Sequence, residues 1–210
     1  MDLSAIAADI RKRFEAKSSA REQGLHSSRA AIRFCANSIR AVHRGEMDVA
    51  RDLQRQAREQ LDIAQDAMRP FPEIYYAGFL HDAEKEYAEA LATYAIINGG
   101  SLPTPEEVRV GDSAYLNGLS EVIGELRRHL LDIIRHGDIA RGEEFLGAMD
   151  DIYYVLVSMD YPDAITGGLR RSTDVARSIM ERSRGDLSIT IVQRRVQDAI
   201  ERARKDFTGS

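Results

Sequence analysis

The sequence has one cysteine, five prolines and no tryptophan among 210 residues. A single cysteine, Cys35, can form neither an internal disulfide nor a cysteine-based zinc site, which is typical of a reducing compartment. No apolar run approaches the ~20 residues that a membrane helix needs. The N-terminus also lacks the basic and apolar regions of a signal peptide. We therefore expect a cytoplasmic protein with no membrane partner.

The charge is unevenly distributed along the chain, although the net charge is only −5. Residues 1–60 contain 12 Lys and Arg against 8 Asp and Glu, whereas residues 71–160 contain 6 against 17. Local patches, rather than the net charge, attract phosphates. A basic nucleic-acid-binding face can therefore coexist with an acidic centre.

Helical periodicity runs through the whole chain, and no segment has the pattern of a β-hairpin. Glycine and proline separate the helical segments. We predict one all-α domain over residues 1–210, a multi-helical bundle of about seven helices. The predicted helices span residues 3–44, 48–68, 74–97, 112–136, 139–159, 167–183 and 188–205. Gly118 and Gly124 are poor helix formers inside the fourth helix, and we attribute them to close approach of a neighbouring helix.

Two acidic stretches lie inside the third and fourth predicted helices. Glu86 and Glu89 are three positions apart, and Glu121 and Glu125 are four apart, so each helix carries a carboxylate pair on one face. If the two faces meet, the four carboxylates form an all-oxygen site suited to Mg²⁺ or Mn²⁺. Spacing alone favours solvated side chains or helix ion pairs over a metal site, because charged helix residues are usually exposed. The absence of a Glu-x-x-His motif disfavours a di-iron carboxylate site.

A polar stripe follows one face of the second half of the first predicted helix. Its members recur at steps of three or four: His26, Arg29, Arg33, Asn37, Arg40 and Arg44. Arg51 and Arg55 continue the basic character on the second predicted helix. Such a stripe favours a phosphate-binding face. A solvated surface with weak salt bridges is the other interpretation of the same residues.

Several segments resemble the translin family, and most closely its translin-associated factor X branch, as a prokaryotic-type translin-like protein. Glu86-Tyr87-Ala88-Glu89-Ala90 is similar to the Glu-Tyr-x-Glu-Ala stretch of that branch. The segment 115–126, which reads Tyr-Leu-Asn-Gly-Leu-Ser-Glu-Val-Ile-Gly-Glu-Leu, is similar to the branch's next segment. Gly137-Asp138 and Arg184-Gly185 match in order and spacing, so the resemblance covers nearly the whole chain.

The resemblance implies a helical protomer that assembles into a hollow homo-oligomer, an octamer, and binds single-stranded RNA or DNA. It also implies a Mg²⁺-dependent endoribonuclease site formed by Glu86, Glu89, Glu121 and Glu125. The oxygen ligands of these residues also suit Mn²⁺. The family's catalytic branch often has Asp where this chain has Glu121, which keeps the charge on a side chain one methylene longer.

The resemblance places nucleic-acid-binding basic segments in the region of the first two helices. The corresponding residues of this chain are Arg29, Arg33, Arg40, Arg44, Arg51 and Arg55.

Two alternative functions remain open at this point. One is a non-catalytic translin-like oligomer that binds single-stranded RNA or DNA, with carboxylates that serve only the structure. The other is a helical scaffold that has no nucleic-acid role. Metal-dependent cleavage distinguishes a nuclease from the first alternative, and salt-dependent RNA binding distinguishes both from the scaffold.

Overall fold

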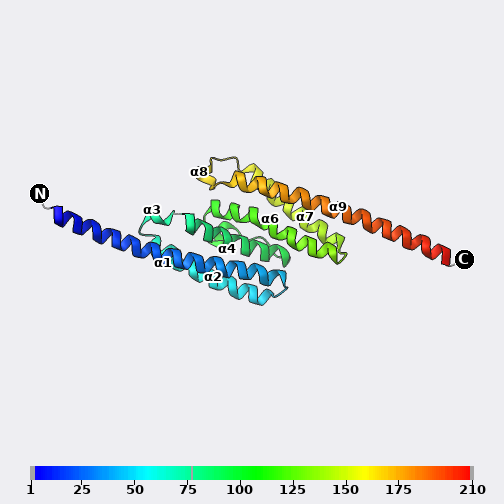
Figure 1. Ribbon diagram of the computed structural model, residues 1–210, viewed down its shortest axis with the longest axis horizontal. Helices are drawn as coiled ribbons and strands as arrows, with labels where there is room; N and C mark the ends of the chain where they lie inside the picture. Colours follow the sequence, from blue (N-terminus) through cyan, green and yellow to red (C-terminus); the bar gives the residue numbers. More distant parts are fainter. Residues whose placement is uncertain (1–2, 77, 209–210) are drawn as a thin grey trace. The chain divides into compact units, whose positions relative to one another are not determined.

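The computed structural model describes residues 3–76 and 78–208 (Figure 1). The described residues form helices and no strand, which confirms the predicted all-α class. Contacts between Cα atoms divide the chain into two compact units, of which the first ends at Leu119 and the second begins at Ser120. Helix α6, Asp112–Arg135, is continuous through this boundary. The single domain over residues 1–210 stays a prediction.

The first unit is built on three long helices that pack against one another. They are α1 (Leu3–His43), α2 (Met47–Met68) and α4 (Gly78–Ile97). Helix α1 packs along α2, and α4 packs against both (Figure 1). Two single-turn helices, α3 (Pro72–Tyr75) and α5 (Pro105–Val108), lie in the connections on either side of α4.

Small side chains allow α1, α2 and α4 to pack closely. Ala50 and Ala57 lie seven positions apart on α2 and are fully buried. The buried Ser38 hydroxyl donates a hydrogen bond to the Ala50 carbonyl at 3.1 Å, which joins α1 to α2. The buried Gln54 amide donates to the Ala90 carbonyl at 3.2 Å, which joins α2 to α4. These directional bonds fix the register of helices whose apolar contacts alone are non-directional.

Glycines end two of the helices where the sequence predicts it. Gly45 has a φ of +76° and follows α1, and Gly137 has a φ of +86° and follows α6. This left-handed conformation suits glycine because it has no Cβ. The Asp138 carboxylate then accepts a hydrogen bond from the Arg141 amide and caps the next helix. The predicted helix ends at residues 44 and 136 therefore agree with the structure to within one residue.

The second unit contains the rest of α6, α7 (Ile139–Ser158), α8 (Asp163–Thr166) and α9 (Leu169–Thr208). Helices α7 and α9 pack side by side (Figure 1). A Cβ added to Gly142 of α7 would lie 2.9 Å from Ile134 and 3.2 Å from Leu187, so only glycine permits this approach. The buried side chains of this unit include Leu126, Leu130, Phe145, Met149, Leu156 and Leu187.

The two helices predicted at residues 167–183 and 188–205 are one continuous helix, α9. Glycine costs about 1 kcal/mol in a helix but does not force an end. Gly185 meets no neighbour within 4 Å, whereas Ser183 and Leu187 on either side of it are buried. Burial on both sides of Gly185 therefore keeps the helix intact.

The third predicted helix also begins later than expected. It starts at Gly78 rather than near Ile74, because Tyr76 leaves the helical conformation and ends the separate short helix α3. None of the helices in residues 3–76 and 78–208 combines the length and the apolar content that a membrane span requires.

Candidate metal centre and nucleic-acid interface

Helix α4 carries four acidic residues in three different environments. Asp82 is exposed. Glu84 is buried, and its carboxylate accepts a hydrogen bond from the Gln65 amide at 2.6 Å. Glu86 is half-buried, and Glu89 is buried, with 7% of its surface exposed. Only Glu86 and Glu89 are therefore candidates for a shielded metal site.

Gly118 brings the start of α6 against this part of α4. A Cβ added to Gly118 would lie 2.7 Å from the Lys85 carbonyl oxygen and 3.1 Å from the Glu89 amide nitrogen. The two backbones are thus in direct contact, as the sequence predicts for this glycine. Gly124 differs, because its added Cβ would make only an ordinary contact, 3.9 Å from Ile179.

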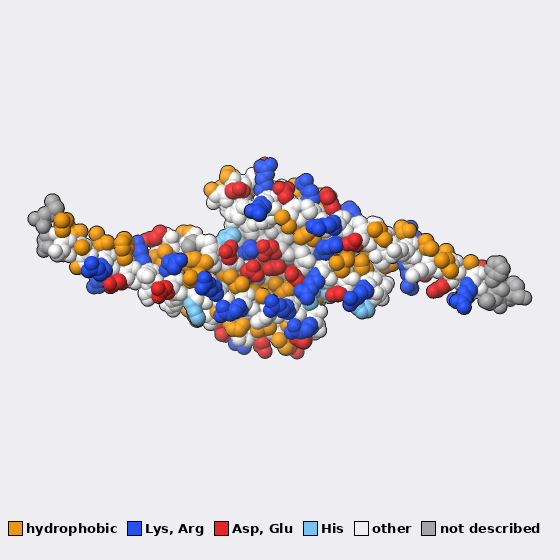
Figure 2. Space-filling view, viewed as in Figure 1, with side chains coloured by type: hydrophobic (Ala, Val, Ile, Leu, Met, Phe, Trp, Pro, Cys, Tyr) orange, Lys and Arg blue, Asp and Glu red, His pale blue; other side chains and the backbone are white. Residues whose placement is uncertain are grey.

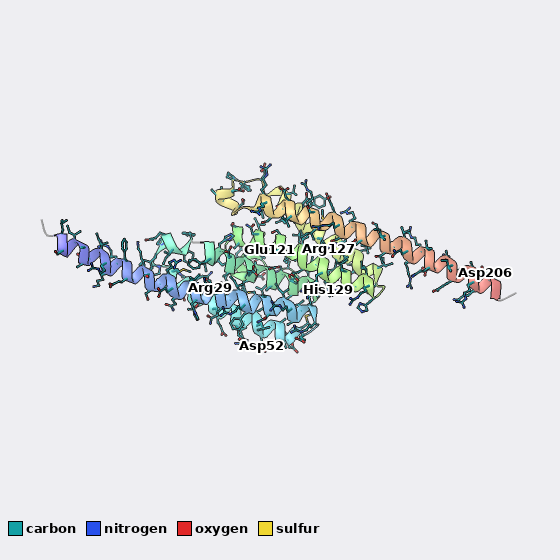
Figure 3. All side chains as sticks on the ribbon, viewed as in Figure 1. Arg29, Asp52, Glu121, Arg127, His129 and Asp206 are labelled. Atoms are coloured by element: carbon teal, nitrogen blue, oxygen red, sulfur yellow. The ribbon has the colours of Figure 1, made fainter. Side chains whose placement is uncertain are left out.

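Glu121 follows Gly118 by one turn on the same continuous helix. Its carboxylate joins those of Glu86 and Glu89, and one oxygen atom of each lies within 4.8 Å of the others. We call these three residues the carboxylate cluster. Glu125 lies one turn further along α6, outside the cluster, and its Oε2 atom is 4.0 Å from the Arg128 guanidinium. Figure 3 labels Glu121 on α6.

The carboxylate cluster fits a small hard cation. Mg²⁺ binds oxygen at 2.0–2.1 Å, so opposite ligands in its octahedron are about 4.2 Å apart. One oxygen atom of each carboxylate in the cluster lies within 4.8 Å of the others, which is close to this separation. Oxygen-only ligands favour Mg²⁺ or Mn²⁺ over softer metals.

A polar network supports α4 on the side of α2. The Arg58 guanidinium lies 5.4 Å from the centre of the Tyr87 ring and donates hydrogen bonds to the Val108 and Arg109 carbonyls. It also donates to Gln65, the residue that binds Glu84. Arg58, which shares its helical face with Arg51 and Arg55 in the sequence, is therefore part of the interior.

Cys35 of α1 lies in the same interior. Burial, followed by the charges of Glu86 and Glu89, raises the pKa of the Cys35 thiol well above its usual range. The thiol therefore stays protonated, and Cys35 is the small core residue that its sequence context predicts.

The polar stripe of α1 is exposed along its whole length, including Arg29, Arg33, Arg40 and Arg44. Basic side chains follow this part of α1 in Figure 2, and Arg29 is labelled in Figure 3. Arg40 donates a hydrogen bond to Asn37, and Arg44 pairs with Glu46, whose pKa it lowers. Among the residues that the structure describes, Arg29 and Arg33 have no acidic partner.

The predicted basic residues of α2 have acidic neighbours within the described chain, unlike Arg29 and Arg33 of α1. Arg51 pairs with Asp48, and Arg55 lies 2.9 Å from Glu59 and 3.7 Å from Asp52. The hydrogen bond that Arg51 donates to the Asp48 carboxylate raises the pKa of Arg51. The positive charge of α2 is therefore largely balanced within the helix, and the stripe of α1 presents the more available cations.

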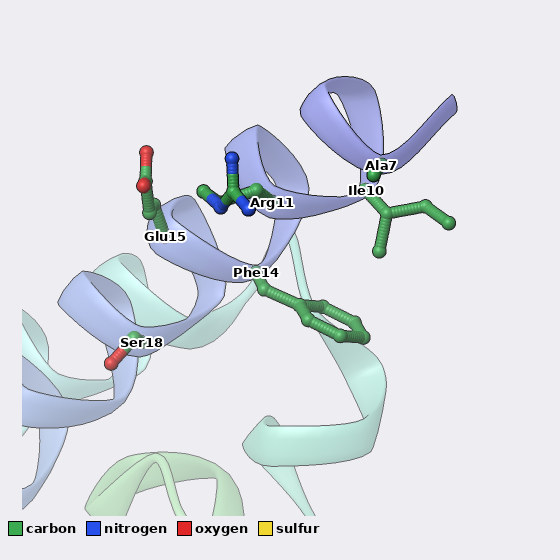
Figure 4. A pocket seen from close by; sticks show the side chains of 6 residues that line it. All are labelled: Ala7, Ile10, Arg11, Phe14, Glu15 and Ser18. Atoms are coloured by element: carbon green, nitrogen blue, oxygen red, sulfur yellow. The ribbon is translucent and has the colours of Figure 1, made fainter. Parts of the chain in front are cut away.

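Two exposed apolar faces were not foreseen from the sequence, although their helical spacing is visible in it. Ile6, Ile10 and Phe14 lie on one face of α1 and are between 38% and 64% exposed. Ile10 and Phe14 line a shallow depression with Ala7 (Figure 4). The far end of α9 carries a similar row with exposures of 52–62%: Ile189, Val192, Val196 and Ile200.

Comparison with known proteins gives relatives that match most of this chain. No family model matches the sequence. It is 33% identical over 179 residues to the uncharacterised protein MJ0175 of Methanocaldococcus jannaschii, a match that covers 84% of this chain and 78% of the relative.

Solved structures of C3PO proteins are similar to the chain as well. The crystal structure of AfC3PO is 34% identical and superposes with a TM-score of 0.81 over 92% of this chain and 99% of that chain. AfC3PO in complex with duplex RNA gives 33% identity and a TM-score of 0.80 over 92% and 98%. Apo-NeC3PO, at 18% identity and a TM-score of 0.79 over 88% and 96%, shares the fold.

Proposed function

The chain belongs to the translin family, and from this premise we propose that it is a metal-dependent endoribonuclease that binds and cleaves single-stranded RNA as a homo-oligomer. The carboxylate cluster of Glu86, Glu89 and Glu121 is the observation that carries the proposal. It also favours the factor X branch, because the resemblance assigns the catalytic carboxylates to that branch. We expect the protein to act in the cytoplasm.

The carboxylate cluster, with Glu125 one turn away, would hold one or two Mg²⁺ or Mn²⁺ ions. Such a cation supplies Lewis-acid activation of water and stabilises charge on the scissile phosphate. Glu89 contributes a carboxylate shielded from solvent, where its interaction with a cation is stronger than at the surface. Glu86 and Glu121 are half-buried, so they contribute oxygens from the side that substrate can reach.

Arg29 and Arg33 would guide the RNA backbone in this proposal, with Arg40 and Arg44 further along the same stripe. Their guanidinium groups are exposed on the helix that packs against α4. Arginine suits phosphate because its planar donors bind two oxygens at once. The AfC3PO complex with duplex RNA supports RNA as the ligand. The preference for single strands over duplex, and for RNA over DNA, is part of the proposal and needs its own measurement.

A homo-oligomer would cover the exposed apolar faces at the ends of α1 and α9. Rows of apolar residues at helical spacing are typical of helix packing seams, and contiguous exposed apolar patches mark interaction sites. The eight-subunit state that the family resemblance implies remains our prediction. Light scattering on the wild type and on Ile6→Asp tests the assembly, because a charge in the seam should reduce the molar mass. A molar mass that equals one chain in the wild type contradicts it.

The proposed activity is tested by cleavage of a labelled single-stranded RNA, with a duplex RNA and a single-stranded DNA of the same sequence in parallel. Wild-type protein should cleave the single-stranded RNA with Mg²⁺ and not with EDTA. Glu89→Gln, which keeps the size of the side chain and removes its charge, should bind RNA and leave it intact. Binding without cleavage by the wild type under Mg²⁺ and under Mn²⁺ would favour the non-catalytic alternative.

A further inference from the structure

Arg128 lies on the same face of α6 as the carboxylates. It follows Glu121 by seven positions, which is two turns or about 10.5 Å along the helix axis. Side chains on a helix tilt toward its N-terminus, so Arg128 is directed back toward Glu121 and Glu125. The observed contact of 4.0 Å between Arg128 Nη1 and Glu125 Oε2 agrees with this direction.

The neighbouring Arg127 makes two hydrogen bonds within the protein, whereas Arg128 makes one long ionic contact. Arg127 donates hydrogen bonds to Ser183 at 3.1 Å and to Asp186 at 2.7 Å, and its side chain is 24% exposed. The side chain of Arg128 is 56% exposed. Its contact with Glu125 is long and joins only one pair of atoms, unlike the bidentate geometry of a strong arginine–carboxylate pair. Arg128 can therefore exchange Glu125 for another anion.

We propose that Arg128 binds a phosphate oxygen of the RNA strand that lies at the carboxylate cluster, an inference that rests on the proposed nuclease function. Phosphates that approach Glu86, Glu89, Glu121 and Glu125 are repelled by like charge. The Arg128 guanidinium, which contacts Glu125 on the same helix face as Glu121, offsets the repulsion and supplies directed donors to the phosphate. Arg128 would thereby select the position of the strand along α6, two turns from Glu121.

Arg135 provides a matched control on the same helix. It lies seven positions after Arg128, on the same face and two turns further from the carboxylates. It pairs with Asp132, three positions before it, at 3.5 Å, as Arg128 pairs with Glu125. Its side chain is 73% exposed. The two arginines differ chiefly in their distance from the carboxylate cluster, so only Arg128 should affect the RNA.

The experiment compares wild type, Arg128→Ala, Arg128→Lys and Arg135→Ala, after circular dichroism and gel filtration have shown equal folding and assembly. Binding of a fluorescein-labelled single-stranded RNA is measured in EDTA over a salt series, and cleavage kinetics are measured in Mg²⁺. Arg128→Ala should weaken binding and lower kcat/KM by about 10-fold, and reduce the slope of log Kd against log salt by about 0.7, the value for one phosphate contact. Arg128→Lys should restore the slope, and Arg135→Ala should match the wild type.

Failure of this inference is distinct from failure of the proposed nuclease activity. If wild type does not cleave but Arg128→Ala loses binding and slope, the phosphate contact stands and the nuclease proposal fails. If wild type cleaves and Arg128→Ala matches it in slope and kcat/KM, the Arg128 inference is overturned and the nuclease stands. Equal losses in Arg128→Ala and Arg135→Ala also overturn it, because they indicate a general surface charge. Arg128→Gln replaces Arg128→Ala if the alanine variant does not assemble.

Discussion

Helices α2 and α4 both carry rows of acidic residues, but their carboxylates have different neighbours. Every acidic residue of α2 lies within 4.0 Å of an arginine nitrogen. These residues are Asp48, Asp52, Glu59, Asp62 and Asp66. Their arginine partners lie in α2 itself, at Arg69 just after its end, or at Arg109. On α4, Lys85 is the one Lys or Arg in the helix, and its Nζ atom is 3.7 Å from Glu86. The carboxylates of α2 thus lie one by one beside arginines, whereas Glu86 and Glu89 of α4 lie together with Glu121.

This difference shows why acidic density in a sequence does not by itself indicate a metal site. Exposed ion pairs at i,i+3 and i,i+4 spacing contribute about 0–1 kcal/mol each and satisfy the charge locally. The carboxylates of Glu86 and Glu89 are shielded, and Gly118 brings a third carboxylate, that of Glu121, beside them. A divalent cation bound there would offset the repulsion among the three carboxylates.

Gly118→Leu should break the contact between α6 and α4. Its side chain would enter the space now occupied by the Lys85 carbonyl and the Ala88 Cβ, which an added Cβ would already approach to 2.7 and 2.9 Å. We expect a loss of about 3 kcal/mol in unfolding free energy, measured by urea denaturation, together with loss of cleavage. Gly147→Ala is the control, because its Cβ meets nothing within 4 Å. It should be neutral or stabilise the protein by up to about 1 kcal/mol, and equal destabilisation by both changes would contradict the proposed contact.

Divalent cations should stabilise the protein through the carboxylate cluster and not through α2. At a Mg²⁺ concentration of 100 times its Kd, the expected gain is about 2.7 kcal/mol, measured as a rise in Tm. Glu89→Gln should remove most of this rise. Glu59→Gln, which removes a paired carboxylate of α2, should keep the wild-type response. A response lost equally in both variants would indicate nonspecific cation binding.

Removing two arginines from α1 should weaken RNA binding more than removing two arginines from α2. Arg29→Ala with Arg33→Ala should weaken single-stranded RNA binding about 10-fold and reduce the salt slope by about 1.4, the value for two phosphate contacts. Arg51→Ala with Arg55→Ala should have a smaller effect, because acidic neighbours already balance these side chains. Fluorescence anisotropy over a salt series measures both, and the reverse order would place the RNA on α2.

Removing acidic neighbours from the arginines of α2 should change RNA affinity least. Asp48→Asn with Asp52→Asn should release Arg51 and Arg55 from two of their acidic neighbours. Because exposed ion pairs are weak, we expect only about a 3-fold gain in RNA affinity, with the gain largest at low salt. Weaker RNA binding by this variant would contradict the account of balanced charge.

The sequence predicts much of this fold because local residues determine it. Gly45 and Gly137 indicate the ends of α1 and α6, and the periodicity of apolar residues predicts the long helices. The continuity of α9 could not be predicted, because the burial of Ser183 and Leu187 around Gly185 depends on tertiary packing. The same holds for Arg58, whose partners Val108 and Arg109 are about fifty positions away in the chain.

The candidate site was predictable only in part, because it depends both on local helical spacing and on a contact between two helices. Helical spacing pairs Glu86 with Glu89, but only the contact at Gly118 between two helices brings Glu121 to them. The presence of a glycine inside a helix was the local signal of that contact. The role we assign to Arg128 also has a local signal, since it continues the spacing of Glu121 and Glu125.

The position of Mn²⁺ in crystals of the protein, determined from its anomalous scattering, shows whether the carboxylate cluster binds a divalent cation. We predict an anomalous peak within bonding distance of the carboxylate oxygens of Glu86, Glu89 and Glu121, and no such peak in crystals of Glu89→Gln. Ordered crystals soaked in Mn²⁺ that show these three carboxylates without a peak between them, or with peaks only along α2, would contradict it.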